Sequence, residues 1–342
     1  MHYTRLRIAT ALMLTSFLLP ATASAGGRPR ASSHPHWQVL LTNPAVTTPT
    51  GLAIDQRGNP KQAKWAYVAD AATQRIIKFG TGGKILDSWQ YGAPTNSAST
   101  ATVAVGGSGN VFVADPATGA VSKFSPNGTL LASWNGFQQP HGIAVDSSGN
   151  VFVAESGPRT VTLLSPAGTV LKRFLPEKLF PPGGPGTPNG VAIGPPGYLY
   201  TSSTCVIGTT CGVGSDVAPH GDLIDGLYEI ISQGPRQGYL MEIWFGLGYL
   251  PSGASQQPPY KEAEPFAGID AITSDRKGNL YVAGTLWPLG GTPARGVLAY
   301  SPYGYKWARW NLPSQSPVHG IAVDPHGTVY VSQGKEVLKL VK

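Results

Sequence analysis

The stretch Pro140-His141-Gly142-Ile143-Ala144-Val145-Asp146-Ser147-Ser148-Gly149-Asn150-Val151-Phe152-Val153-Ala154-Glu155 predicts a strand, a tight turn and a second strand. Its two β-branched runs, 143–145 and 151–154, favour extended backbone. The Asp, Ser, Gly and Asn residues between them are typical of turns, because Asp and Ser bond locally to the backbone and Gly accepts a positive φ. Residues 160–164 and 169–174 then predict two further strands around a Ser-Pro-Ala-Gly turn. The stretch therefore opens a unit of four strands.

Related four-strand units recur along the chain. Their first strands are predicted at 51–55, 102–105, 143–145, 190–193, 271–273 and 320–323. A unit of this kind cannot bury both of its faces alone, so neighbouring units must stack. Short strands at regular spacing with turns between them argue for an all-β protein, and the six copies predict a six-bladed β-propeller.

The last copy lacks a strand. It ends at Lys342, where its fourth strand is expected to begin. The segment His36–Leu41 has the sequence of an outer strand and no copy of its own. Pairing this N-terminal strand with the last copy would close the ring and remove two sheet edges. The alternative is that residues 36–41 form only a leading strand.

The pattern Pro-His-Gly-Ile-Ala-Val-Asp, Gly-Asn and Val-Phe-Val-Ala-Asp/Glu resembles the repeat of NHL-repeat proteins. The resemblance covers residues 36–342 and is strongest in copies 1, 2, 3 and 6. It implies a six-bladed propeller. It does not specify an activity, because such propellers include both binding modules and enzymes.

The N-terminus predicts an exported protein. Residues 1–25 have the basic start, short apolar run and Ala-Ser-Ala end of a signal peptide. Residues 26–35 are expected to be a disordered leader, and residues 36–342 a single propeller domain. We expect a monomer that is secreted, or periplasmic or extracellular, with no transmembrane anchor after cleavage of the signal peptide, because no later apolar run is long enough to span a bilayer.

Charge and cysteine content add to this expectation. The formal net charge is +7, but the Lys and Arg residues are scattered, so no nucleic-acid partner is expected. Cys205 and Cys211 are the two cysteines, and in an oxidising compartment they could form a small loop-closing disulfide. A zinc site is less favoured for them, because two thiols alone do not complete a tetrahedral site.

The long connections suggest where a partner binds. They are residues 175–188, 203–225, 246–265 and 285–295. In an up-and-down sheet all four leave on the same face, and scaffolds carry function on such loops. A neutral drift in loop length is the alternative.

One position recurs at the start of the first strands, five residues before the turn residue, and it is polar in most copies. It is occupied by Thr50, Ala101, His141, Asn189, Asp270 and His319. These residues should ring the mouth of the central channel, so Thr50, His141, Asn189, Asp270 and His319 are candidate ligand-binding residues. Imidazole and carboxylate groups bind divalent metals, so His141, Asn189, Asp270 and His319 are candidate metal ligands for zinc or calcium. The alternative is that these side chains only bond channel water and neighbouring backbone.

Two functions remain open. The first is a binding scaffold that engages an unknown protein, glycan or small-molecule ligand through the long-loop face and the channel mouth. The second is a metal-dependent lyase or hydrolase with His141, His319 and Asp270 as candidate catalytic residues. Resemblance to streptogramin lyases and peptidyl-amidoglycolate lyases implies metal-assisted chemistry at His141 and His319. Resemblance to gluconolactonase-like and paraoxonase-like propellers implies a calcium site at Asn189 and Asp270.

Overall fold

Strands and their turns make up the described part of the chain. The computed structural model describes residues 35–57, 65–92, 100–174, 187–194, 198–206, 223–231, 240–244, 266–286, 292–302 and 306–341. Within these ranges the strands form six sheets of four strands each, and all neighbouring strands are antiparallel.

Five sheets are made of four strands that follow one another in sequence. The first three hold β2 (Pro49–Ile54), β3 (Trp65–Asp70), β4 (Arg75–Gly80) and β5 (Ile85–Gln90); β6 (Thr102–Val105), β7 (Val111–Asp115), β8 (Ala120–Phe124) and β9 (Leu130–Asn135); and β10 (Pro140–Val145), β11 (Val151–Glu155), β12 (Thr160–Leu164) and β13 (Val170–Phe174). The next two hold β14 (Thr187–Ile193), β15 (Tyr198–Val206), β16 (Leu223–Ile231) and β17 (Leu240–Trp244); and β18 (Phe266–Ser274), β19 (Leu280–Leu286), β20 (Ala294–Tyr300) and β21 (Lys306–Asn311).

The last sheet combines the two ends of the described chain. It contains β22 (Val318–Val323), β23 (Val329–Gln333) and β24 (Glu336–Val341), and β1 (His36–Leu41) is its outer strand. β1 runs antiparallel to β24, with Trp37 opposite Leu340. The Trp37 indole Nε1 also donates a 2.8 Å hydrogen bond to the carbonyl of Asn311 in the preceding sheet.

The turn between the first two strands of a sheet is fixed by its aspartate. In the quoted stretch, Asp146 Oδ1 accepts hydrogen bonds from the backbone N–H groups of Ser148 and Asn150, at 2.9 and 2.8 Å. Gly149 has a φ of +84°, which a residue with a Cβ rarely adopts. Asp275 and Asp324 accept the corresponding backbone bonds in two other sheets. These aspartates are turn residues, as predicted.

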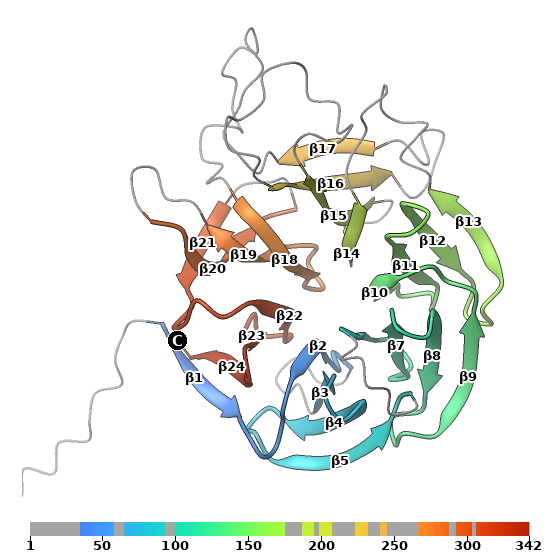
Figure 1. The fold of residues 1–342 in the computed structure, drawn as a ribbon, viewed down its shortest axis with the longest axis horizontal. Helices are drawn as coiled ribbons and strands as arrows, with labels where there is room; N and C mark the ends of the chain where they lie inside the picture. Colours follow the sequence, from blue (N-terminus) through green and yellow to red (C-terminus); the bar gives the residue numbers. More distant parts are fainter. Residues whose placement is uncertain are drawn as a thin grey trace, which may run out of the picture. The chain divides into compact units, whose positions relative to one another are not determined.

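The inner strands contact one another around a common centre (Figure 1). β2 contacts β6 and β22, β10 contacts β6 and β14, and β18 contacts β14 and β22. Apolar side chains fill the space between neighbouring sheets; for example, Phe112 and Ala114 of one sheet share a core cluster with Ile143 and Val153 of the next. This face-to-face packing of sheets around an axis is the architecture of a β-propeller.

Tryptophans of the outer strands pack onto turns of the neighbouring sheet. A Cβ added to Gly128 would lie 2.6 Å from the ring of Trp89, and one added to Gly168 would lie 2.2 Å from the ring of Trp134. Both rings also contact an aromatic residue, since Trp89 lies 6.0 Å from Tyr67 and Trp134 lies 6.2 Å from Phe112, measured between ring centroids. Both tryptophans therefore pack between neighbouring sheets.

Several sequence-based predictions fall outside the described residues. They include the signal peptide, most of the 26–35 leader and most of the long segments 175–188, 203–225 and 246–265. The Cys205–Cys211 disulfide also stays a prediction, because Cys211 is not described. Among the residues that are described, no helix is long and apolar enough to cross a membrane.

Candidate functional site

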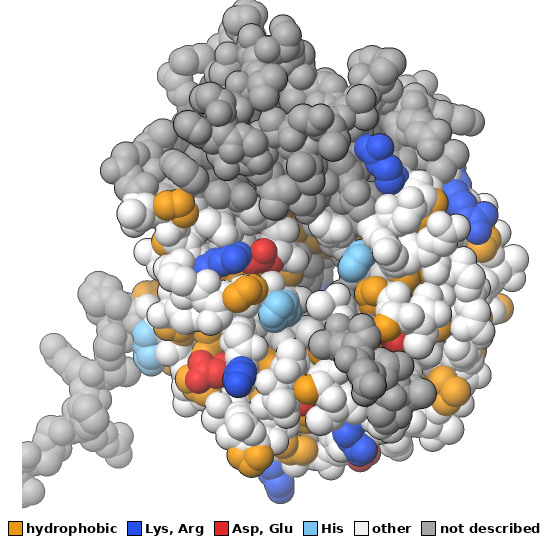
Figure 2. Space-filling view, viewed as in Figure 1, with side chains coloured by type: hydrophobic (Ala, Val, Ile, Leu, Met, Phe, Trp, Pro, Cys, Tyr) orange, Lys and Arg blue, Asp and Glu red, His pale blue; other side chains and the backbone are white. Residues whose placement is uncertain are grey.

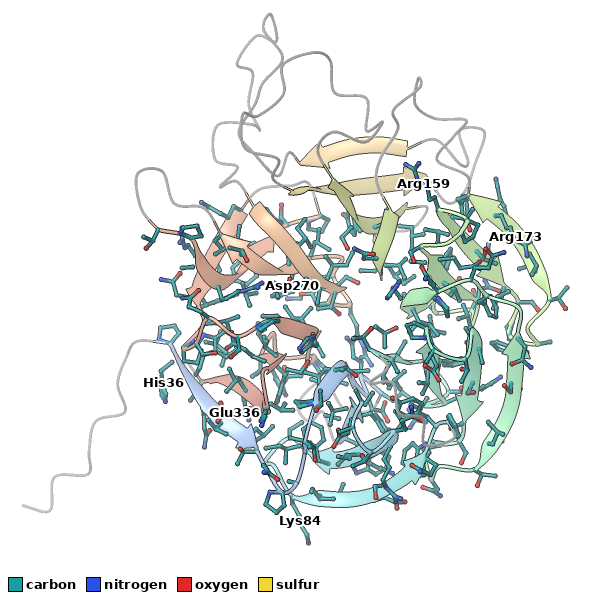
Figure 3. All side chains as sticks on the ribbon, in the orientation of Figure 1. His36, Lys84, Arg159, Arg173, Asp270 and Glu336 are labelled. Atoms are coloured by element: carbon teal, nitrogen blue, oxygen red, sulfur yellow. The ribbon has the colours of Figure 1, made fainter. Side chains whose placement is uncertain are left out.

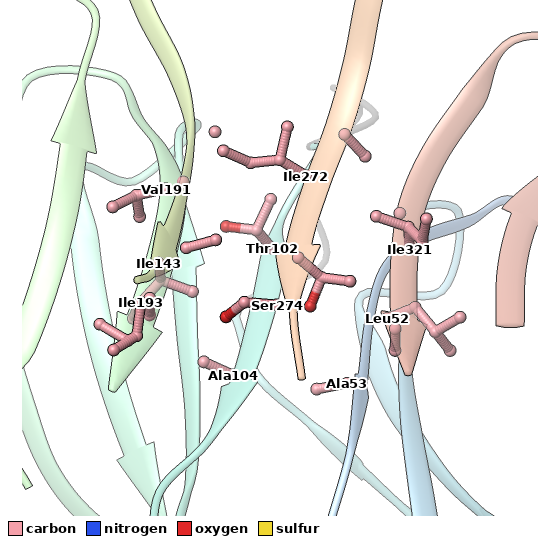
Figure 4. Close-up of a pocket in the computed structure, with 18 of the residues that line it drawn as sticks. Leu52, Ala53, Thr102, Ala104, Ile143, Val191, Ile193, Ile272, Ser274 and Ile321 are labelled. Atoms are coloured by element: carbon pink, nitrogen blue, oxygen red, sulfur yellow. The ribbon is translucent and has the colours of Figure 1, made fainter. Parts of the chain in front are cut away.

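A cavity of about 1460 Å³ lies between the inner strands. Its wall takes residues from β2, β6, β10, β14, β18 and β22. The close-up in Figure 4 shows the apolar side chains Leu52, Ile143, Val191, Ile272 and Ile321 in the wall, together with Thr102 and Ser274. A cavity that combines apolar side chains with polar groups can bind a small molecule.

Polar residues gather where the inner strands begin. Of the predicted residues, His141, Asn189, Asp270 and His319 line the cavity. Figure 2 shows histidine atoms near the middle of this face, together with an adjoining acidic and basic pair.

Each of these four residues lies at an irregularity of its strand. The pairing register shifts between Pro140 and Gly142, between Pro188 and Gly190, between Ile269 and Ala271, and between Val318 and Gly320. A bulge adds one residue that has no partner on the neighbouring strand and redirects its side chain. The bulges therefore explain why His141, Asn189, Asp270 and His319 leave the packed sheets and reach the cavity.

Glycine after the bulge residue lets the inner strands come close together. A Cβ on Gly142 would lie 2.6 Å from the carbonyl oxygen of Asn189, and a Cβ on Gly320 would lie 2.6 Å from that of Thr50. Because the starts of neighbouring strands touch in this way, the bulge residues all lie at one end of the channel. We call this end the channel mouth, defined by His141, Asn189, Asp270, Arg295 and His319.

The two histidines of the channel mouth lack hydrogen-bond partners among the described residues. Neither imidazole makes a hydrogen bond to a protein group within the described part of the chain. Burial lowers the pKa of His141 below 6.5, and burial together with the positive charge of Arg295 lowers the pKa of His319. Both rings are therefore neutral at pH 7, and each has one nitrogen that can donate and one that can accept.

Asp270 binds a basic residue that the sequence analysis did not identify. Its Oδ2 forms an ion pair with the guanidinium Nη1 of Arg295 and accepts a 3.3 Å hydrogen bond from the backbone N–H of Val318. Figure 3 marks Asp270 on the inner part of its sheet. Burial raises the pKa of Asp270, and Arg295 and the Val318 N–H oppose that rise. Val318 belongs to the next sheet, so Asp270 connects β18 to the strand that carries His319.

Thr50 is placed differently from the other candidates. Its side chain is buried, and its hydroxyl donates a 2.9 Å hydrogen bond to the carbonyl of Ala101 in the next sheet. Thr50 is not among the described residues that line the cavity. We therefore leave it out of the channel mouth and assign it to the contact between β2 and the neighbouring sheet.

Comparison with known proteins agrees with this architecture. Residues 137–162 match the family model of the NHL repeat. The chain is similar to NHL-repeat propellers. The matched residues include the stretch quoted at the start and His141. A comparison with curated proteins gives no sequence match.

Solved structures resemble this NHL-like propeller along most of its length. A streptogramin B lyase has a TM-score of 0.56 and 14% identity, over 90% of this chain and 97% of the lyase. A gluconolactonase from Xanthomonas campestris has a TM-score of 0.56 and 16% identity, over 89% of this chain and 88% of the enzyme. A catalytically inactive virginiamycin B lyase from Staphylococcus aureus with quinupristin has a TM-score of 0.55 and 13% identity, over 90% and 100% of the two chains. At such identities the likeness shows the β-propeller fold.

The channel mouth of this NHL-like propeller does not fit a divalent metal well. Within the described residues, no group of three or more His, Cys, Asp and Glu side chains could hold an ion. One oxygen of Asp270, Oδ2, already binds Arg295 and the backbone N–H of Val318. A dication at Asp270 or His319 would also lie close to the guanidinium charge. The described residues therefore offer too few free ligands for zinc or calcium, both of which need several.

Arg295 was missed because a strand begins earlier than the sequence suggested. Residues 285–295 were expected to be a connection, with the third strand starting at Val297. Instead, pairing of β19 with β20 continues to Leu286 and Ala294, with Thr285 opposite Arg295. The extension carries Arg295 to the channel mouth. Two glycines, Gly284 and Gly296, lie opposite each other just inside it and conceal the strand pattern.

Proposed function

We propose that the chain is a six-bladed propeller that binds a small molecule at the channel mouth. The six sheets would be the blades, and pairing of β1 with β24 would close the ring. The unbroken cycle of contacts among the inner strands supports this. Closure makes the channel a rigid ring, and rigid elements hold binding side chains in place.

One observation carries the proposal of binding. His141 and His319 are both partly buried in the wall of a large cavity, yet neither ring bonds a protein group among the described residues. Each neutral ring therefore offers the cavity one nitrogen that can donate and one that can accept a hydrogen bond. A ligand with oxygen or nitrogen atoms could bond these rings, and the apolar side chains of the wall would contact the rest of it.

The wider scaffold role remains part of the proposal. The long segments 175–188, 203–225 and 246–265 connect strands of the sheets that carry Asn189 and Asp270. A protein or glycan partner would bind through these long segments. An exported chain with a signal peptide at residues 1–25 fits such a role outside the cytoplasm.

A metal-dependent lyase or hydrolase is the second candidate. The structures of a streptogramin B lyase and a gluconolactonase align with about nine tenths of this chain. Neutral imidazoles, as expected for His141 and His319, suit both metal binding and general base catalysis. The poor fit of the described residues to a metal places this candidate second.

A thermal-shift screen of the full chain against lactones, cyclic peptides and small carboxylates tests the proposal. We expect some compounds to raise the melting temperature, and we expect the rise to disappear in a His141→Gln/His319→Gln variant. His326→Gln is the matched control, because His326 is exposed and uses only its backbone N–H to bond Asp324. If the compounds stabilise the double histidine variant as much as the His326→Gln control, they bind elsewhere and the proposal is wrong.

A further inference from the structure

Arg295 is held in the wall of the channel mouth rather than on an open surface. Its side chain is 19% exposed and that of Asp270 is 24% exposed. The ion pair is anchored further, because Asp270 accepts the backbone N–H of Val318 from the next sheet. A partly buried guanidinium with a fixed partner has a defined position in the site.

We propose that the Arg295 guanidinium is the resident cation of the channel mouth, where a divalent metal would otherwise act, and that it binds a carboxylate or phosphate group of the ligand. This inference rests on the proposed function, because it names the chemical class of the ligand for that same site. It adds Arg295 as a binding residue and Asp270 as the residue that positions it.

The charge balance of the channel mouth disfavours a dication. Asp270 is the carboxylate that the described residues bring to this end of the cavity, and Arg295 already neutralises it. The other acidic residues of the cavity wall, Asp146 and Asp275, cap turns at the opposite end of their strands. Calcium and zinc sites gain their affinity from several anionic or neutral donors directed at one point. Here a positive charge lies where the ion would bind.

The donor set of the channel mouth suits an anionic group. A guanidinium has five N–H donors in a planar fork that matches a carboxylate or phosphate. Within the described residues, the side chain of Arg295 uses Nη1 for Asp270 and makes no other hydrogen bond. Its remaining N–H groups can therefore serve a ligand. The field of Arg295 reaches His319, whose neutral ring could bond a second atom of the same ligand.

Divalent cations provide the first arm of the test. Full-length protein treated with a chelator would be titrated with Ca²⁺ and with Zn²⁺ by calorimetry, beside Arg295→Met. We expect no saturable binding of either ion to the wild type and saturable Zn²⁺ binding to Arg295→Met, because removal of the guanidinium charge leaves Asp270 and His319 without a competing cation. Stoichiometric metal binding by the wild type that weakens in Asp270→Asn would overturn the inference.

Anion probes provide the second arm. Acetate, phosphate and the uncharged acetamide would be titrated into the full chain and followed by NMR. We expect acetate or phosphate to bind at least tenfold more tightly than acetamide, and this preference to vanish in Arg295→Met. Response to acetate alone would indicate a carboxylate ligand, and response to phosphate alone a phosphate ligand. Arg57→Met is the matched control, because Arg57 lines the opposite end of the same cavity and binds Asp55.

A folding control keeps the result interpretable. Arg295→Met leaves Asp270 without its partner and could destabilise the chain, so Arg295→Met/Asp270→Asn removes both charges together. If this double variant folds and binds the anions as tightly as the wild type, the inference is wrong. A screened ligand that binds Arg295→Met unchanged but not the histidine variant would overturn only this inference. Binding of no probe and no screened ligand would overturn the proposed function as well.

Discussion

The Nζ of Lys339, near the end of the chain, donates a 3.1 Å hydrogen bond to the carbonyl of Thr81 in the turn between β4 and β5. The same relationship recurs between other neighbouring sheets. Lys78 of β4 donates to Pro126 at 2.8 Å, and Lys123 of β8 donates to Pro166 at 3.1 Å. The last sheet is thus joined to the first as other sheets are joined to their neighbours.

The strand β1 should stabilise the whole ring. It contributes the buried Leu41, and its Leu40 packs on Gly83 of the neighbouring sheet. We compare a chain that starts at Pro35 with one that starts at Thr42. The shorter chain loses a strand and at least one buried leucine, so we expect it to lose about 3 kcal/mol or more of unfolding free energy, in a single cooperative transition.

Urea denaturation followed by circular dichroism and by tryptophan fluorescence measures this loss. If both chains unfold at the same urea concentration, β1 does not stabilise the propeller and the proposed closure by β1 is wrong.

The contact between Trp89 and Gly128 should be sensitive to one added methyl group. Gly128 has a φ of +80°, and its Cβ would lie 2.6 Å from the Trp89 ring. Gly136 has a φ of +94° with no neighbouring atom within 4 Å, so Gly136→Ala measures backbone strain alone. We expect Gly128→Ala to lower the free energy of unfolding by about 1–3 kcal/mol more than Gly136→Ala does, as measured by thermal unfolding. Equal costs would show that packing of Trp89 on the turn adds nothing.

Lys78 should contribute more to stability than a surface lysine. Its side chain is buried, its Nζ lies 4.2 Å from the centroid of the Trp65 ring, and it bonds the carbonyl of Pro126. We expect Lys78→Met to lower the free energy of unfolding, measured by urea denaturation, by about 2 kcal/mol. The loss comes from the charged hydrogen bond and the cation–π contact. Lys84→Met is the control, because Lys84 is exposed and points away from the sheets (Figure 3). A Lys78 variant as stable as the Lys84 variant would contradict this account.

The histidines of the channel mouth should make stability depend on pH. Their pKa values in the folded chain lie below the ordinary 6.5, so the unfolded chain takes up these protons first as the pH falls. Their contribution is complete above about pH 6.5 and is lost as the pH falls through their folded pKa values. When the pH is lowered from about 7.5 to about 5.5, the melting temperature of the wild type should fall further than that of His141→Gln/His319→Gln. His326→Gln should follow the wild type, and identical pH profiles for all three chains would refute the assignment.

Much of the strand pattern could be predicted from the sequence. The turn residues Asp146 and Gly149 mark where the first two strands of a sheet meet, and the β-branched runs on each side mark the strands. The spacing from turn to bulge also located His141, Asn189, Asp270 and His319, because each lies at the same position of its strand.

Arg295 could not be found in this way. It lies on a third strand, outside the repeated first-strand position, and glycines interrupt the pattern around it. Thr50 occupies the repeated position, yet its hydroxyl bonds the backbone of the adjacent sheet. Spacing along one strand predicts where a residue lies, whereas its partner is set by packing between sheets.

NMR spectra of the ring nitrogens of His319, in the full chain labelled with ¹⁵N-histidine, test the central claim most directly. Acetate, phosphate and Zn²⁺ would be added separately at pH 7, with the exposed His36 as an internal control. We predict that His319 is neutral, that acetate or phosphate shifts its ring signals, and that Zn²⁺ leaves them unchanged. Metal-induced shifts at His319 without any response to the anions would contradict a site organised around Arg295.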